Sequence, residues 1–173
     1  VGCPSRGDDA AAMLRTLTAL AKVDGRVCAF LEPIALYMTK DLYEAGDGQW
    51  QFAYPAPGEA MTLGEGRVYH EDADDLVVFT FGNGVPMALR AARTIEAELK
   101  WKVRVVDLRW LAPLNDAFIA AQAKNAKRIL VLDEGRKSAG VGEGVITAIV
   151  EAGLGDRGSR PRRDTPSSAR SAS

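Results

Sequence analysis

Histidine and cysteine are scarce in this chain of 173 residues. It has one histidine, His70, and two cysteines, Cys3 and Cys28. Two lone thiols support neither a disulfide framework nor a cysteine-rich zinc site, and one histidine excludes a His-rich metal site. A mechanism that needs a catalytic histidine therefore has a single candidate, and the sequence around it shows no Ser-His-Asp order and no Cys-His pair.

A strong charge of one sign and long apolar runs are also lacking. The formal net charge is -1, which provides no basic field for nucleic acid. No run approaches the roughly 20 apolar residues of a membrane-spanning helix. With 47% hydrophobic and 26% charged residues, the composition is that of a globular protein. We expect one full domain plus a smaller piece, with no nucleic-acid partner and no membrane partner.

The two ends of the chain are unusual. The sequence begins at Val1 without a methionine or a signal peptide, and residues 158–173 contain no Leu, Ile, Val or aromatic residue. A segment without large apolar side chains cannot offset its ordering entropy by burial. We expect residues 158–173 to be a disordered or frameshifted tail, and its arginines leave contact with an acidic partner as an alternative.

The first third of the chain has the pattern of one βαβ unit. Apolar residues recur at helical spacing after the acidic pair Asp8 and Asp9, which suits a helix N-terminus. The apolar run at residues 27–31 predicts a buried strand, and residues 1–3 have the pattern of the end of an earlier strand. Residues 46–66 are rich in turn-forming Gly, Pro and Asp and predict a linker. The alternating aromatics there favour packing over ligand stacking: Trp50, Phe52 and Tyr54.

From residue 67 the pattern becomes regular. Strands are predicted at 75–81, 103–108 and 128–132, each followed by a helical pattern: one ending near Trp101, one beginning at Asp116, and one over 140–153. Strands that alternate with helices of this length form parallel βαβ crossovers with helices on both faces of the sheet. The predicted fold class is therefore α/β, a three-layer α/β/α domain with a mostly parallel sheet.

Ligands of open α/β sheets bind beyond the carboxyl ends of the strands, where three loops are predicted. The turn Gly82–Gly84 opens a helix and offers a phosphate cradle, although it lacks the full G-x-G-x-x-G pattern and a P-loop lysine. The second loop is Asp107–Arg109. In the third, Asp133 and Glu134 suit acid-base work or a metal, but loop capping or pairing with Arg136 and Lys137 is favoured. His70 is interpreted as a solvated residue at a strand edge.

Six short strings, taken together, are typical of one family. They are Val1–Ser5 leading to Asp8–Ala10, Phe30–Pro33 with Leu36–Tyr37, Phe81–Val85, Val105–Arg109 followed by Leu111–Leu114, Val131–Glu134 and Ser138–Gly142. As a set they resemble the C-terminal part of the β subunit, or β half, of the E1 component of thiamin-diphosphate-dependent 2-oxo acid dehydrogenases. The resemblance covers residues 1–157, and the second string is most similar to the branched-chain (2-oxoisovalerate) type.

The resemblance implies a domain division. Residues 1–45 would be the C-terminal remnant of a pyrimidine-binding domain, 46–66 the linker and 67–157 a transketolase C-terminal-like domain. The family continues into a further strand where this chain has its Ser/Arg tail, so we expect truncation or a frameshift near Gly158 and an open sheet edge.

The resemblance carries over no catalytic, cofactor-binding or metal-binding residue. The family's activating glutamate, stacking aromatic and channel histidine would all lie upstream of Val1, and Glu32 follows a strand that comes after that region. The stretch Ala21–Arg26 corresponds to a monovalent-cation loop but is longer than usual. Gly46–Gly48 reads Gly-Asp-Gly like the family's metal motif, yet it lacks the preceding strand and the spaced Asn, so a turn is expected.

The resemblance also implies a function. The intact parent would oxidatively decarboxylate a 2-oxo acid with thiamin diphosphate and Mg²⁺ and acylate the lipoyl group of an E2 acyltransferase, in the cytoplasm or the mitochondrial matrix. Its partners would be an E1 α subunit, a second β copy and E2. The fragment alone is expected to bind no cofactor and to be inactive. Two alternatives stay open: a stand-alone α/β interaction module, and a nucleotide-binding protein that uses Gly82–Gly84.

Overall fold

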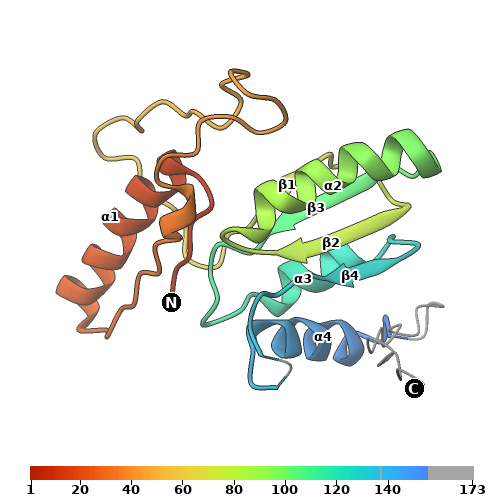
Figure 1. Cartoon of the computed structure of the whole chain (residues 1–173). Coiled ribbons are helices and arrows are strands. Elements are labelled where there is room, and N and C mark those ends of the chain that lie inside the picture. Colours follow the sequence, from red (N-terminus) through yellow and green to blue (C-terminus); the bar gives the residue numbers. More distant parts are fainter. Residues whose placement is uncertain (137, 156–173) are drawn as a thin grey trace, which may run out of the picture.

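A four-stranded sheet forms the centre of the C-terminal part of the molecule (Figure 1). The computed structural model describes residues 1–136 and 138–155. Its helices and strands run in the order α1 (Gly7–Asp24), a 3-10 turn (Ile34–Leu36), β1 (Arg67–Tyr69), β2 (Leu76–Thr80), α2 (Gly84–Leu99), β3 (Val103–Asp107), α3 (Asp116–Ala123), β4 (Ile129–Val131) and α4 (Val141–Glu151). The tail 158–173 lies outside the described residues.

The strand order in the sheet is β1-β3-β2-β4. Strand β2 pairs in parallel with β3 on one side and with β4 on the other, which confirms the three predicted parallel strands. Strand β1 pairs antiparallel with β3, with Arg67 opposite Asp107, and was not predicted. In the described part of the chain, β4 has no second neighbour, and Leu130 at its centre is 47% exposed.

Helices cover both faces of the sheet. Alternate residues of β2 point to opposite sides. Val77 and Phe79 pack in the core that α3 and α4 share, whereas Leu76 and Val78 pack with the buried face of α2. In Figure 1, α2 lies on one side of the strands and α3 and α4 lie on the other. The predicted three-layer α/β/α domain is confirmed.

The N-terminal segment packs at the carboxyl end of this sheet. Its helix α1 buries Met13 and Leu17 against Met61 and Trp110. The predicted strand at 27–31 is wrong as an element, because only one isolated parallel bridge, between Gly2 and Phe30, forms there. The bridge has the parallel direction of a βαβ crossover. The described residues offer this run no further strand to pair with, and so its first residue, Val27, is fully exposed.

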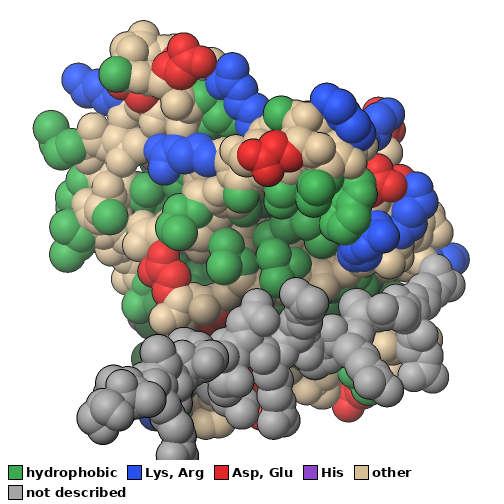
Figure 2. Space-filling view, turned by 45° about the vertical axis from the view of Figure 1, so that its right-hand side comes forward, with side chains coloured by type: hydrophobic (Ala, Val, Ile, Leu, Met, Phe, Trp, Pro, Cys, Tyr) green, Lys and Arg blue, Asp and Glu red, His purple; other side chains and the backbone are tan. Residues whose placement is uncertain are grey.

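Exposed apolar side chains gather on the N-terminal segment. A lone βαβ unit cannot cover both of its sheet faces, which predicts an apolar surface around Phe30, Leu31 and the helix face of Met13 and Leu17. Those two helix residues are buried. The exposed large apolar side chains of this segment are instead Leu14, Val23, Val27, Leu31, Ile34, Tyr37, Met38 and Tyr54. Figure 2 shows hydrophobic side chains gathered on the left and in the centre of one face of the molecule. None of the described helices has both the length and the apolarity to cross a membrane.

Candidate functional site

A buried polar cluster joins the N-terminal segment to the sheet. At its centre the carboxylate of Asp9, in the first turn of α1, receives two guanidinium groups. Arg67 Nη2 of β1 lies 2.7 Å from Asp9 Oδ1, and Arg109 Nη1 lies 3.0 Å from the same oxygen. Asp9 and Arg109 are only 3% and 5% exposed. A buried carboxylate held by two cations ties three separate segments together, and removing one partner of such a pair is costly.

Arg109 carries most of these connections. It follows β3 in a left-handed backbone conformation, with φ of 58°. Its guanidinium donates to the backbone carbonyls of Glu65 and Gly66, at 3.0 and 2.9 Å, as well as to Asp9. The end of the 46–66 stretch is therefore fastened to the same residue as α1.

Asp107 is the second carboxylate of the cluster, and it forms no ion pair with a described side chain. It is fully buried at the end of β3, where it accepts hydrogen bonds from the Ser5 hydroxyl and from the Arg109 backbone N–H. Burial raises the pKa of Asp107 to about 7; the Ser5 hydrogen bond opposes that rise, and the negative charge of Asp9 adds to it. The carboxyl group that joins Ser5 to the sheet therefore titrates near neutral pH.

Sequence reasoning found only part of this cluster. It singled out Asp107–Arg109 as a strand-end loop, and it assigned Asp8 and Asp9 to a helix N-terminus. Asp8 does remain local, in an ion pair with Arg6 at 2.7 Å. Asp9 is instead buried and accepts hydrogen bonds from Arg67 and Arg109, which lie 58 and 100 positions further along the chain. No local spacing rule reveals contacts over such separations. Ser5 and Arg67 were missed for the same reason.

The carboxyl ends of β2 and β4 form a second site, a crevice of about 180 Å³. Gly82 and Asn83 lie on one side of it and Glu134 on the other, with Asn83 Nδ2 and Glu134 Oε2 3.4 Å apart. Asp133 is used structurally, because its carboxylate accepts the backbone N–H groups of Gly135 and Gly142 at 2.7 and 2.8 Å. The capping interpretation is confirmed for Asp133. Lys137, offered as an ion-pair partner, lies outside the described residues.

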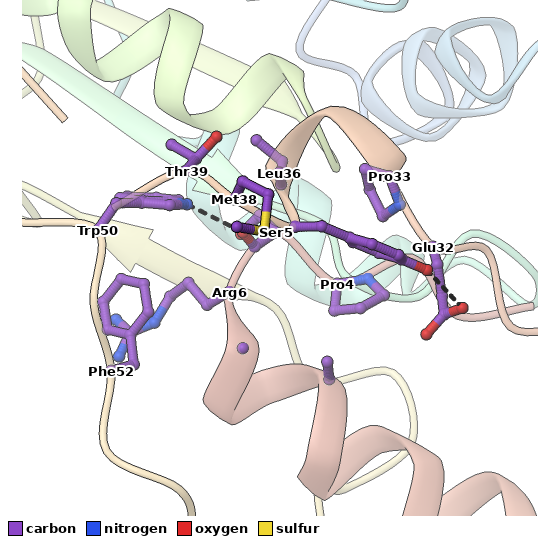
Figure 3. Close-up of a pocket in the computed structure, with 13 residues that line it drawn as sticks. Pro4, Ser5, Arg6, Glu32, Pro33, Leu36, Met38, Thr39, Trp50 and Phe52 are labelled. Carbon is purple, nitrogen blue, oxygen red and sulfur yellow. Dashed lines mark hydrogen bonds between the residues drawn. The ribbon is translucent and has the colours of Figure 1, made fainter. Parts of the chain in front are cut away.

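A cavity of about 490 Å³ lies between the start of α1 and residues 32–52 (Figure 3). Figure 3 shows Arg6 over the ring of Phe52, 3.7 Å from its centroid, and Trp50 pointing toward Ser5. Trp50 is buried and its Nε1 donates to the Ser5 carbonyl at 3.2 Å. The packing interpretation is therefore confirmed for Trp50 and Phe52. Tyr54 is 78% exposed, with the Arg15 guanidinium 5.5 Å from its ring centroid.

The remaining candidates are not brought together. His70 is exposed at the end of β1, with Nδ1 3.1 Å from the Val103 carbonyl oxygen, and lies outside both cavities. Glu32 accepts the Tyr37 hydroxyl at 2.7 Å. All residues of the stretch Ala21–Arg26 are exposed, and Asp24 Oδ2 lies 3.5 Å from Arg26 Nε.

The surroundings of two further candidates, Cys3 and Asp47, favour a structural role over a chemical one. Burial, with smaller contributions from Asp107 and Glu134, raises the pKa of the Cys3 thiol to about 11, so the reactive thiolate is scarce. Asp47 lies in a turn, as expected, and its carboxylate accepts four backbone N–H groups, from Leu42, Tyr43, Glu44 and Gln49. Desolvation acts upward on its pKa, but these hydrogen bonds outweigh it and hold the pKa well below its usual range. Within the described residues, no group of three or more His, Cys, Asp or Glu side chains is placed to hold a metal ion.

Comparison with known proteins agrees with this architecture. The model of the transketolase C-terminal domain matches residues 64–168, which include the whole sheet. The chain belongs to the transketolase C-terminal domain family. A solved structure described as a split-gene transketolase, an inactive β4 tetramer, superimposes with a TM-score of 0.50 at 27% identity, over 56% of this chain and 31% of that one.

Several curated relatives of this transketolase-family chain are dehydrogenase β subunits. The 3-methyl-2-oxobutanoate dehydrogenase subunit beta of Mycobacterium tuberculosis is 36% identical over 122 residues, or 69% of this chain and 33% of the relative. The pyruvate dehydrogenase E1 component subunit beta of Staphylococcus aureus is 28% identical over 60% of this chain and 32% of its own. The 1-deoxy-D-xylulose-5-phosphate synthase of Anaeromyxobacter dehalogenans is 35% identical over 58% of this chain and 17% of its own. The chain spans about a third of the length of these two dehydrogenase subunits.

Proposed function

We propose that this chain is part of the E1 β subunit of a 2-oxo acid dehydrogenase complex of the branched-chain type. The observation that carries the proposal is the 36% identity to the mycobacterial 3-methyl-2-oxobutanoate dehydrogenase subunit, which covers 69% of this chain. The 122 aligned residues are more than the family domain spans at residues 64–168. The similarity to the mycobacterial subunit therefore includes residues outside that domain. The role of the chain is to supply the C-terminal sheet domain and subunit contacts, and its partners are an E1 α subunit, a second β copy and the E2 lipoyl acyltransferase.

The described residues do not fit the thiamin diphosphate and Mg²⁺ of such an enzyme. The Gly-Asp-Gly string offers one carboxylate, and Asp47 already uses it to accept four backbone N–H groups, which leaves it poorly suited as a ligand for a cation. We therefore assign the cofactor to other parts of the parent assembly. Oxidative decarboxylation is the chemistry of that whole assembly.

A calorimetric titration tests the absence of cofactor binding. The purified chain is titrated with thiamin diphosphate and Mg²⁺ and then assayed with 2-oxoisovalerate and an artificial electron acceptor. We expect neither micromolar binding nor turnover above buffer, because the cofactor site is assigned to other parts of the assembly. General acid-base groups alone contribute about 10²–10⁴-fold to the reaction rate, and the binding cleft orients the reactants as well. Micromolar binding or measurable turnover would show that the active site has been misplaced.

A chimeric enzyme tests the role in the dehydrogenase. Residues 1–155 of this chain replace the matching segment of the mycobacterial β subunit, which is then co-expressed with its α subunit. The proposal predicts that the chimera assembles with the α subunit and decarboxylates 3-methyl-2-oxobutanoate. A chimera that folds but fails to bind the α subunit would refute the proposal and favour the stand-alone interaction module. The matched control carries Asp133→Ala, which removes the acceptor at the start of α4 and should reduce stability without preventing assembly with the α subunit.

A further inference from the structure

The cavity of about 490 Å³ beside the start of α1 is large enough for a small molecule. Three segments that are distant in the sequence build its walls: residues 4–10, residues 32–39, and the extended stretch that carries Trp50 and Phe52. Figure 3 shows Trp50 and Phe52 on one side of it and Pro33 on the other. Small-molecule sites usually have about 300–1,000 Å³, and an apolar cavity of roughly 150 Å³ already holds benzene. A compound of two fused rings is therefore within the capacity of this cavity.

Contacts within the chain hold the aromatic side of the cavity in place. Trp50 is buried, and its Nε1 donates to the Ser5 carbonyl at 3.2 Å. Its ring meets that of Phe52 edge to face, with the centroids 5.2 Å apart and an angle of 78° between the planes. The guanidinium of Arg6 lies 3.7 Å from the Phe52 centroid and fixes that ring from its own side. Flat surfaces fixed in this way favour a planar ligand, which can stack on one ring or meet it edge to face.

Every polar side chain that lines the cavity already has a partner within the chain. The pairs are Trp50 with the Ser5 carbonyl, the Ser5 hydroxyl with Asp107, Arg6 with Asp8, Tyr37 with Glu32, and the Thr39 hydroxyl with the Ala35 carbonyl. The charge of Arg6 is balanced by Asp8 at 2.7 Å, and the Glu32 carboxylate is exposed to solvent. A charged ligand would lose its hydration inside the cavity and gain no free partner in return, so the wall favours a neutral, apolar ligand.

The rim of the cavity is also apolar. Met38 and Tyr37 belong to the lining, although they are 83% and 59% exposed. Apolar side chains that rim a cavity in this way are typical of a binding site. The unbranched side chain of Met38 adapts readily to the shape of what it contacts, so it can pack against a ligand seated in the cavity.

We propose that this cavity binds a free, neutral and planar aromatic compound of about two fused rings. Such a compound contacts the aromatic side at Trp50 and Phe52 and the aliphatic side at Pro33 and Leu36, and it needs no hydrogen bond from the wall. Its binding comes from the apolar surface that it and the cavity remove from water. The proposal does not rest on the dehydrogenase role, because it uses the walls of the cavity alone.

The side-chain N–H signals of tryptophan in the full ¹⁵N-labelled chain test the proposal, because Trp50 lines the cavity and the other two tryptophans do not. The probes are indole, benzothiophene, 1-adamantanol, indole-3-carboxylate and tryptamine. We expect indole to shift the Trp50 signal saturably, with a dissociation constant on the order of 1 mM, and to leave Trp101 and Trp110 unshifted. Benzothiophene lacks the N–H of indole and should bind at least as tightly, because the wall offers no free acceptor. The globular 1-adamantanol and the two charged indoles should bind roughly fivefold more weakly or less.

Two variants connect the shift to the cavity, and urea unfolding checks that each one folds. Ala10→Phe fills the cavity from α1 and should abolish the shift, whereas Ala19→Phe makes the same change at an exposed position of α1 outside the lining. Met38→Asp puts a charge on the rim and should weaken indole binding roughly fivefold or more, whereas Met87→Asp, at an exposed position of α2, should leave it unchanged. The proposal is overturned if indole gives no saturable Trp50 shift, if 1-adamantanol or a charged indole binds as tightly as indole, or if folded Ala10→Phe or Met38→Asp binds indole as tightly as the unmodified chain.

Discussion

The titration of Asp107 should make the stability of this protein fall as the pH rises toward neutrality. Its pKa in the folded chain is about 7, compared with an ordinary value of 3.8, so the folded state holds the proton more tightly than the unfolded state does. The stabilisation from the protonated group is fully present below pH 3.8 and is lost as the pH rises through about 7. At 1.36 kcal/mol per pKa unit, the whole shift corresponds to about 4 kcal/mol.

The variant Asp107→Asn isolates this effect. An amide keeps an acceptor for the Arg109 backbone N–H and a group that can bond the Ser5 hydroxyl, but it does not titrate. Urea unfolding of both proteins is followed between pH 5 and 8. The unmodified chain should lose stability across this range, by up to about 1.4 kcal/mol per pH unit, and the variant should lose much less.

A control removes the one histidine of the chain. Both proteins are also measured with His70→Gln, so that this side chain is the same in every comparison. The difference between the pH profiles with and without Asp107 should survive this substitution. Equal slopes for the unmodified chain and Asp107→Asn would refute the reasoning, because they would mean that Asp107 has the same pKa in the folded and unfolded states.

Three further predictions follow from the contacts around the cluster and the helices. Arg109→Ala should lower the free energy of unfolding by about 3–5 kcal/mol, because it leaves Asp9 buried with a single cation, whereas Arg67→Ala, whose side chain is 32% exposed, should cost about 1 kcal/mol in the same urea measurement. Asp133→Ala should cost about 1–2 kcal/mol by removing the cap on α4, as followed by thermal unfolding, and an unchanged midpoint would contradict the capping role. The isolated chain should self-associate through the exposed apolar side chains of its N-terminal segment, as measured by light scattering, and Ile34→Ser with Met38→Ser should reduce this; a monomeric unmodified chain at high concentration would contradict it.

The α/β architecture was predictable because its signals are local. Each parallel strand is a short apolar run, and each helix follows within a few residues with its own period, so strand and helix boundaries were found near Leu76, Val103 and Ile129. Strand β1 carries no such signal. It has three residues, all half-buried, and it exists because β3 offers an open edge to Arg67–Tyr69. An edge strand of this kind is specified by its neighbour more than by its own sequence.

The run at residues 27–31 failed for the opposite reason. Its composition is that of a buried strand, but an apolar run becomes a strand only when a neighbouring strand pairs with it over several residues. Gly2 supplies one bridge to Phe30, and the described residues supply no other. The prediction from composition was therefore correct about direction and pairing and wrong about the extent of the strand.

The buried cluster explains how a segment with so little sheet pairing keeps one position. Apolar contacts between α1 and Trp110 are strong but non-directional, so by themselves they allow the helix to slide or rotate on the sheet end. The Asp9 carboxylate between Arg67 and Arg109, and the Ser5 hydroxyl on Asp107, are satisfied in one arrangement only. Any sliding of the helix would leave a buried charge unpaired. The free-energy cost of that unpaired charge is larger than the change in apolar contact energy as the helix slides. The same contacts hold Cys3 and Glu32 over the crevice at the ends of β2 and β4, so the geometry of that crevice depends on charges that lie outside it.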